Sequence, residues 1–231
     1  MNSKTFCKTV IFYFLILFGF SFWGCATLPK EIYVPLNPGA ERLPVYKKFP
    51  VQAALLISEE DKNYVYKVTP SIYLLSNIVH VFPLGDALEK DSIRIFSQIF
   101  RGVQVVRTPA EAQKFKIVIA PKIEEFNFRY DEAKGSYEAP NILFTAAIKG
   151  KITLYSEGTQ ILEKSVKPPE QQKIAHYQTG FTNEEEMGEV ASRALNSALM
   201  KMAEEIAQDP EVEKNAAGAA IDGLKKTYGR R

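Results

Sequence analysis

The stretch Asn141–Val166, NILFTAAIKGKITLYSEGTQILEKSV, predicts a pair of antiparallel strands. Apolar side chains recur at even positions along its first part, at Ile142, Phe144, Ala146, Ile148, Ile152 and Leu154. This alternation is typical of a strand that buries one face and exposes the other. Glu157-Gly158 then predicts a tight turn, after which Gln160–Val166 forms the second strand. The hairpin therefore predicts an antiparallel sheet as the frame of the fold.

The segment before this hairpin, Lys114–Tyr130, predicts a long strand with one irregularity. Its apolar residues lie at odd positions up to Ile123 and at even positions from Phe126 onward. Because successive residues of a strand face opposite sides of the sheet, the buried face changes between Pro121 and Glu125. A β-bulge at this place restores the register, and Pro121 favours a bulge or a sheet edge.

Shorter strands are predicted closer to the N-terminus. Val51–Ser58 is a compact apolar run that suits a buried strand. The next segment is rich in aromatic and β-branched residues but contains Pro70, so it predicts two strand-like pieces, Tyr64–Val68 and Ile72–Phe82. Val103–Arg107 suits a further strand.

Two segments change to helical spacing. Leu84–Phe100 places apolar residues three or four positions apart, and Gly102 follows where a glycine commonly ends a helix. In the second segment, Thr182–Glu185 matches a capping box and Asp209-Pro210 marks the end. The apolar face of this second helix consists of Met187, Val190, Ala191, Ala194, Leu195, Ala198, Leu199, Met202 and Ile206.

The order of these elements predicts an α+β fold, a two-layer sandwich with two helices packed on one face of a mixed, mainly antiparallel sheet. We expect this domain to span residues 51–210. Residues 25–50 are rich in proline and favour an extended tether, and packing along the surface of the domain is the alternative. Residues 211–231 are expected to form a flexible basic tail with one weak helix.

The composition limits the classes of partner. The chain has 29 basic and 27 acidic residues, and 46% of it is hydrophobic. Loss of Lys4 and Lys8 with an N-terminal leader leaves these charges balanced. A balanced surface has no basic patch for nucleic acid, so no nucleic-acid partner is expected. The hydrophobic content suits a packed core.

No pattern of catalytic or metal-binding residues stands out. The histidines His80 and His176 lie far apart and no cysteine follows Cys25, so neither a metal site nor a metal cofactor is expected. His80, in an apolar run, suits a buried strand residue with a satisfied hydrogen bond. No nucleophile elbow or phosphate-binding glycine loop occurs, so no catalytic residue is assigned. The acidic clusters that keep a carboxylate-dependent hydrolase open as an alternative are Glu59–Asp61, Glu124-Glu125 and Glu184–Glu186.

Apolar and aromatic residues concentrate in two of the predicted strand segments, and two interpretations remain open for them. These residues form part of the core, or they form an apolar contact surface for a lipid or a partner protein. The residues of this candidate contact patch are Tyr64, Tyr66, Ile72, Tyr73, Leu74, Phe126 and Phe128.

The N-terminus has the layout of an export signal. Lys4 and Lys8 precede an uncharged apolar run, Thr9–Leu28. Within this run, Gly24-Cys25 resembles the lipobox of bacterial lipoproteins. The resemblance implies a signal peptide of residues 1–24, cleavage between Gly24 and Cys25, and lipidation of Cys25.

Lipidation of Cys25 implies a covalent diacylglycerol and an N-acyl chain, and two or more chains anchor a protein stably. Ala26 after the cysteine resembles lipoproteins that are sorted to the outer membrane, which implies a body facing the periplasm. Cleavage removes Cys7, so no unpaired thiol remains in an oxidising compartment. The alternative is an uncleaved helical anchor in the inner membrane, because Thr9–Leu28 is about as long as a membrane span.

The element order also resembles small envelope lipoproteins, the YajG-type and LptE-like proteins. The resemblance rests on FPLGDALEKDSIRIFSQIF followed by VQVVR, on FKIVIAPKIEEF, and on the late hairpin and helix. It implies a non-enzymatic accessory or assembly factor that binds an envelope membrane protein, a lipid or a glycan. A lipid or glycolipid carrier with a cavity between sheet and helices is the alternative.

Overall fold

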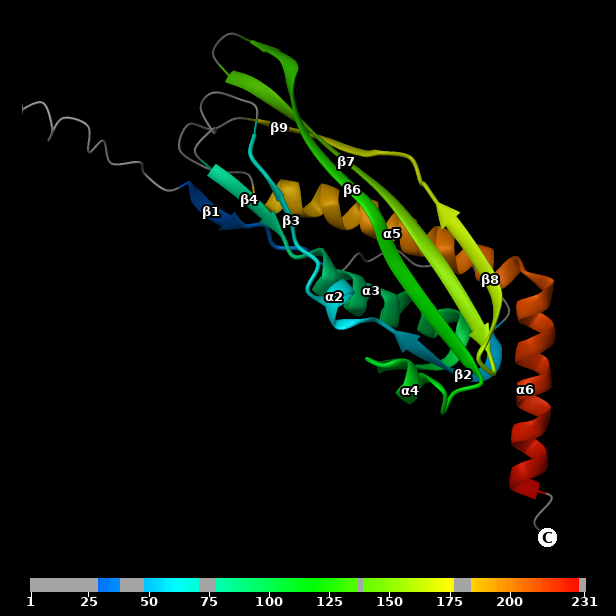
Figure 1. The fold of residues 1–231 in the computed structure, drawn as a ribbon. Helices are drawn as coiled ribbons and strands as arrows, with labels where there is room; N and C mark the ends of the chain where they lie inside the picture. Colours follow the sequence, from blue (N-terminus) through cyan, green and yellow to red (C-terminus); the bar gives the residue numbers. More distant parts are fainter. Residues whose placement is uncertain (1–28, 38–47, 71–77, 137–138, 177–183, 229–231) are drawn as a thin grey trace, which may run out of the picture. The chain divides into compact units, whose positions relative to one another are not determined.

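Two long strands, β6 (Ile117–Ser136) and β7 (Ala139–Ser156), form the centre of a six-stranded sheet in the computed structural model of the protein (Figure 1). The structure describes residues 29–37, 48–70, 78–136, 139–176 and 184–228. At 132–136, 139–140, 176 and 220–228 it describes the backbone alone. The architecture below concerns the unit that runs from Glu31 to the C-terminus.

The six-stranded sheet is mixed and mainly antiparallel, as predicted. Its order is β5 (Phe100–Val106), β2 (Phe49–Leu56), β6, β7 and β8 (Thr159–Val166), and β9 (Gln171–His176) also pairs with β7. β2 runs parallel to both β5 and β6. The pairs β6–β7, β7–β8 and β7–β9 are antiparallel.

The predicted bulge and the predicted hairpin turn are both confirmed. The pairing of β6 with β7 shifts register between Ile123 and Glu125, where the apolar pattern changes parity. The turn between β7 and β8 consists of Glu157, with φ of 50°, and Gly158, with φ of 83°. Positive φ at both central positions matches the twist of the flanking strands, and it explains the glycine at this turn.

A second, three-stranded sheet has the order β1 (Lys30–Tyr33), β4 (Ile78–Phe82) and β3 (Tyr66–Val68). It packs on β6 through aromatic rings: the Phe82 ring centroid lies 4.7 Å from that of Phe128, and Tyr66 lies 4.9 Å from Phe126. The expectation of a single sheet is therefore wrong, because β1, β4 and β3 form a sheet of their own. Strands do form in both predicted pieces, with the part between them outside the described residues.

Two long helices, α3 (Leu84–Ile99) and α5 (Glu184–Gln208), pack on one face of the six-stranded sheet, which confirms the predicted α+β class. The whole apolar face predicted for the second helix is buried. Thr182, the predicted cap of that helix, lies outside the described residues. The short helix α4 (Pro109–Ala112) adds a small apolar cluster made of Ala54, Val106, Ala112 and Val118.

One local prediction needs correction. Gly102 does not end a helix, because α3 passes directly into β5 at Phe100, whose backbone is already extended. The helix expected in the C-terminal segment is α6 (Pro210–Tyr228). Asp209 caps it, since its Oδ1 accepts hydrogen bonds from the backbone N–H groups of Glu211 (2.9 Å) and Val212 (3.1 Å). Pro210 therefore begins a helix as well as ending one.

Part of the proline-rich tether packs on the domain. Val34 is fully buried, and its N–H donates to the carbonyl of Val81 at 2.9 Å. The next residue, Pro35, lies so close to α5 that a Cβ at Gly188 would come within 1.9 Å of its carbonyl oxygen. Only a glycine in the first turns of α5 permits this approach. The surface-packed alternative therefore holds for this part of residues 25–50.

We expect the substitution Gly188→Leu to lower the free energy of unfolding by about 2 kcal/mol, because a side chain there must displace Pro35. The backbone N–H of Val34 should also lose its protection against hydrogen exchange. Gly218→Leu is the matched control, since nothing outside its own helical turn lies within 4 Å of the added Cβ. Equal effects of the two substitutions on Val34 protection would contradict the assigned role of Gly188.

Candidate binding site

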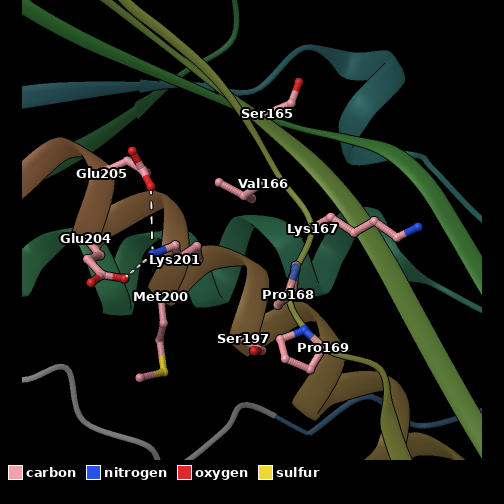
Figure 2. A pocket seen from close by; sticks show the side chains of 10 residues that line it. All are labelled: Ser165, Val166, Lys167, Pro168, Pro169, Ser197, Met200, Lys201, Glu204 and Glu205. Carbon is pink, nitrogen blue, oxygen red and sulfur yellow. Dashed lines mark hydrogen bonds and ion pairs between the residues drawn. The ribbon is translucent and has the colours of Figure 1, made fainter.

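An open cavity of about 560 Å³ lies between the end of β8 and one face of α5 (Figure 2). Its strand-side wall is the run Ser165–Pro169. Its helix-side wall consists of Ser197, Met200, Lys201, Glu204 and Glu205. Small-molecule sites in proteins usually measure about 300–1,000 Å³, so the cavity has the size of a ligand site.

The helix-side residues share one face because they follow Ser197 by three, four, seven and eight positions. Lys201 Nζ lies 2.7 Å from Glu204 Oε2 and 3.8 Å from Glu205 Oε1. The hydrogen bond from Lys201 and its positive charge lower the pKa of Glu204. This wall therefore presents an ammonium group between two carboxyl groups.

The strand-side wall owes its shape to Pro168-Pro169. Two consecutive prolines fix φ and remove two backbone N–H donors, so the wall offers acceptors rather than donors at this place. The carbonyl oxygen of Pro169 accepts a hydrogen bond from Gln171 Nε2 at 3.3 Å. At the other end of the wall, Ser165 Oγ donates to Glu124 Oε2 at 3.3 Å. Figure 2 shows the side chain of Lys167 directed away from Lys201.

Six of the ten lining residues carry charged or hydroxyl groups, and Val166, Met200 and the prolines add to an exposed lining surface that is slightly more apolar than polar. Such groups can hydrogen-bond a ligand that carries hydroxyl or amide groups. An acyl chain needs an apolar lining, because buried polar groups without partners are destabilising. Elsewhere between the sheet and the helices, in the described part of the domain, lies the packed core. The cavity therefore suits a ligand that combines hydrogen-bonding groups with some apolar surface better than it suits an acyl chain alone.

The structure separates the residues of the candidate contact patch. Phe126 and Phe128 are 4% and 2% exposed and belong to the core, so they form no contact surface and the core interpretation holds for them. Tyr64 and Tyr66 are half-buried and pack against the same core. Ile72, Tyr73 and Leu74 lie outside the described residues, as do Gly24 and Cys25.

His80 is buried in β4, as predicted, and is only 1% exposed. Its Nδ1 lies 2.8 Å from the hydroxyl oxygen of Tyr130, while Nε2 has no hydrogen-bond partner among the described residues. Burial lowers the pKa of His80, and the nearby carboxyl group of Glu184 opposes this shift. Burial also raises the pKa of Tyr130, which keeps its hydroxyl group protonated. The pair is a neutral polar contact inside the core. His176 is the last residue of β9.

The lowered pKa of His80 predicts that acid destabilises the fold. Unfolded histidine binds a proton below about pH 6.5, whereas folded His80 resists protonation until lower pH. Stability should therefore fall as the pH drops through about 6.5 toward the folded pKa. Urea unfolding at about pH 7.5 and pH 5 measures this slope. The variant His80→Gln should show a shallower slope, and an unchanged slope would contradict the assignment to His80.

A second buried polar cluster joins α3 to α5. Asp91 is 2% exposed, and its Oδ1 accepts a hydrogen bond from Arg94 Nε at 3.2 Å. Arg94 also donates to the side-chain oxygen of Asn196, which is fully buried. Burial raises the pKa of Asp91, and the charge of Arg94 and its hydrogen bond oppose the shift. This cluster fixes two helices against each other.

The three acidic clusters have ordinary structural roles. Glu59 begins the short helix α2 (Glu59–Lys62) and pairs with Arg107 at 3.6 Å. Glu124 sits at the bulge of β6, where a hydrogen bond from Lys149 lowers its pKa. A general acid needs a raised pKa, so Glu124 does not suit that role. The third cluster, Glu184–Glu186, forms the first turn of α5.

Neither metal ligation nor membrane spanning is seen in the described residues. No three side chains of His, Cys, Asp or Glu among them are grouped to hold a metal ion. Over that same part of the chain, no helix combines the length and the apolarity that crossing a membrane requires.

Comparison with known proteins finds similarity only at the level of solved structures. No family model and no curated protein matches the chain. A protein from Xanthomonas campestris is 13% identical, with 86% of this chain and 98% of that chain covered and a TM-score of 0.37. A neuraminyllactose-binding hemagglutinin homologue from Helicobacter pylori is 7% identical, with 83% and 100% covered and a TM-score of 0.43. Lipoprotein B from Nitrosomonas europaea is 11% identical, with 80% and 96% covered and a TM-score of 0.31. No conclusion about function rests on similarities at this level.

Proposed function

We propose that this chain is an envelope lipoprotein that acts by binding, with its body in the periplasm and its anchor in the outer membrane. The observation that carries the binding role is the cavity between β8 and α5, whose size suits a ligand and whose lining includes charged or hydroxyl groups from six of its ten residues. Its carboxyl groups lie beside Lys201. This arrangement suits recognition of a ligand more than acid–base chemistry, which uses carboxyl groups of raised pKa.

The anchor rests on the N-terminal sequence. A basic start, an apolar run and Gly24-Cys25 agree with cleavage before a lipidated cysteine. The test is the intact mass of protein extracted with detergent from native membranes, beside a Cys25→Ser variant. We expect a chain that begins at Cys25 and is heavier by a diacylglycerol and an acyl chain. A full-length, unmodified mass would contradict the lipid anchor and leave an uncleaved helix in its place.

The ligand class follows from the chemistry of the lining. Glu204 and Glu205 can accept hydrogen bonds, Lys201 can donate them, and the hydroxyl groups of Ser165 and Ser197 can do both. A short segment of an envelope glycan, which is rich in hydroxyl and amide groups, satisfies such a lining. An accessory role in the envelope then follows, since a periplasmic body that holds a glycan segment can position it for membrane-protein partners.

We expect Lys201→Met to weaken the binding of such oligosaccharides by about tenfold or more, because it removes a donor whose loss also leaves Glu204 and Glu205 uncompensated. An array of envelope oligosaccharides identifies the ligand, and titration calorimetry compares the variants. Lys122→Met, which removes an exposed lysine outside the cavity, is the matched control. The fold should be unaffected, since an exposed ion pair contributes about 0–1 kcal/mol.

The outcome that contradicts the glycan site is a binding constant that Lys201→Met and Lys122→Met leave equally unchanged. Absence of binding to every oligosaccharide of the array would also contradict it. Both results leave the lipid anchor to be judged by the intact mass alone.

A further inference from the structure

The six-stranded sheet ends at β5, whose outer side pairs with no described strand. The backbone N–H of Ile57, just after β2, donates to the carbonyl oxygen of Val106 at 3.3 Å, so the polar groups of Val106 face β2. Because successive residues of a strand direct their N–H and C=O groups to opposite edges, those of Arg101, Val103 and Val105 face outward. None of the hydrogen bonds seen in the described part of the chain involves these groups. β5 therefore presents three N–H and three C=O groups that another strand can bond.

The other edge strands are protected against such pairing, and β5 is not. Natural proteins commonly place lysine on an edge strand, because its charge opposes the docking of a second strand. Each other edge strand among the described residues carries one, namely Lys30 on β1, Lys67 on β3, Lys164 on β8 and Lys173 on β9. β5 has no lysine, no proline and no acidic residue, and its part from Gly102 onward is uncharged. This composition suits an edge that a partner covers.

The side chains of β5 leave open space at this edge. Val103 and Val105 are half-buried and pack against the core from the rim of the sheet. A Cβ built at Gly102 would meet only Cγ of Gln52, at 3.9 Å. Gln104 lies on the same face as Gly102, two residues later, and is exposed. The edge therefore combines an open position with a long polar side chain beside it.

We propose that two copies of this chain pair through β5, antiparallel and around a two-fold axis. In the register that uses every outward residue, Val103 lies opposite its own counterpart, and Arg101 lies opposite Val105 of the second copy. These pairs make about six main-chain hydrogen bonds, which supply the affinity when a strand is added to a sheet edge. This contact requires neither the lipid anchor nor the cavity of the proposed function.

Two features of β5 favour a second copy as the occupant. Gly102 lies opposite Gln104 of the second copy in this register, so the long side chain of one strand fills the open position of the other. Arg101 meets no like charge there, whereas a shift of two residues would place it opposite Arg107, or else place Val105 opposite α3. A two-fold contact uses the same surface on both copies, and β5 complements itself in shape and in charge.

Single cysteines test the register in native membranes. Antiparallel residues that exchange hydrogen bonds have Cα atoms about 5.5 Å apart, which a disulfide can bridge. Val103→Cys faces its own counterpart, whereas Val105→Cys, the matched control, lies about 13 Å from its counterpart. The parent chain shows how much cross-linking comes from Cys7 and Cys25. Under mild oxidation we expect Val103→Cys to yield a product of twice the chain mass, about tenfold more than Val105→Cys yields.

Loss of one outward donor tests the hydrogen bonds. Val105→Pro removes an N–H that faces the outer edge and keeps the pairing with β2, because proline is tolerated on the open side of an edge strand. We expect the dissociation constant of the dimer, measured by sedimentation equilibrium of the full chain in detergent, to rise about tenfold or more. Val105→Thr is the matched control, since it keeps the N–H and the β-branched shape and should leave the constant unchanged.

Several results would overturn the two-fold pairing. One is equal cross-linking of Val103→Cys and Val105→Cys, or none above that of the parent chain. A cross-linked product whose mass is not twice that of the chain would do the same and would indicate a strand of another protein as the occupant. An equal rise in the dissociation constant for Val105→Thr and Val105→Pro would contradict the role of the N–H. If urea unfolding shows that Val105→Pro does not fold, the two cysteine variants decide.

Discussion

Replacing Phe82 with alanine is expected to lower the free energy of unfolding by about 3–5 kcal/mol. Phe82 is fully buried at the junction of the two sheets. Its ring centroid lies 4.7 Å from Phe128, 5.7 Å from Phe126 and 6.3 Å from Tyr66. Removing the ring leaves a cavity that these neighbours cannot fill without moving their strands. Since small domains have a total stability of about 5–15 kcal/mol, the loss is a large fraction of it.

Equilibrium urea unfolding measures this effect, and Phe82→Leu is the graded control, because leucine fills more of the space. We also expect hydrogen exchange in β3 and β4 to rise more than in β7, since the small sheet depends on this junction. A loss below about 1 kcal/mol for Phe82→Ala would show that the sheets are held together by other contacts.

The substitution Arg94→Met is expected to destabilise the fold by about 3 kcal/mol at neutral pH, because it leaves the Asp91 carboxylate buried without its partner. Met retains much of the apolar stem of arginine, so lost packing contributes little. The loss also removes the donor that satisfies Asn196. Thermal or urea unfolding of the variant measures the difference.

The pH dependence separates charge from packing in this cluster. Burial raises the pKa of Asp91 above its unfolded value, so the folded state binds the proton more tightly than the unfolded state does. This group therefore favours folding at low pH, and its contribution is lost as the pH rises through the folded pKa. Arg94→Met should strengthen this trend, so the variant should lose less stability at about pH 4.5 than at pH 7.5. The same loss at both values would indicate packing, and Asp91→Leu/Arg94→Met should recover much of the stability.

Local patterns predicted much of this fold. The parity change of the apolar residues predicted the bulge at Glu124. One extra residue in the strand is needed to keep the apolar side chains on the same buried face before and after this point. Glu157-Gly158 predicted the hairpin because few residues adopt positive φ. The apolar stripe of α5 predicted its buried face in full. Each of these features is decided by residues close together in sequence.

Features that depend on distant segments were not predicted. Nothing within Tyr64–Val68 or Ile78–Phe82 indicates that these strands pair with β1 in a separate sheet. Phe100 continues the helical spacing of α3, but it is the first residue of β5. Its side chain is buried as part of that strand. The aromatic pattern of β6 was equally consistent with a surface patch and with core, because periodicity shows that a face is apolar without showing what covers it.

The candidate site could not be predicted from the sequence, for a similar reason. Its two walls, Ser165–Pro169 and the face of α5 that contains Lys201, come from segments more than 25 residues apart. Neither wall has a motif of its own. The acidic residues of α5 follow a spacing that a solvent-exposed helix face also shows. Pro168-Pro169 was the one local pattern that indicated an irregular backbone on the strand side of the site.

The parallel pairing of β2 with both β5 and β6 has a consequence for the order of folding. The antiparallel strands β6, β7 and β8 follow one another along the chain and can pair early, because closing short loops is fast. β2 instead pairs with segments about 50 and 64 residues away, Ala53 with Val103 and with Ile117. We therefore expect β2 to be inserted late, when the strands on both sides are already in place. In a chain synthesised from its N-terminus, β2 is made before β5 and β6 and would still be among the last strands to acquire its native contacts.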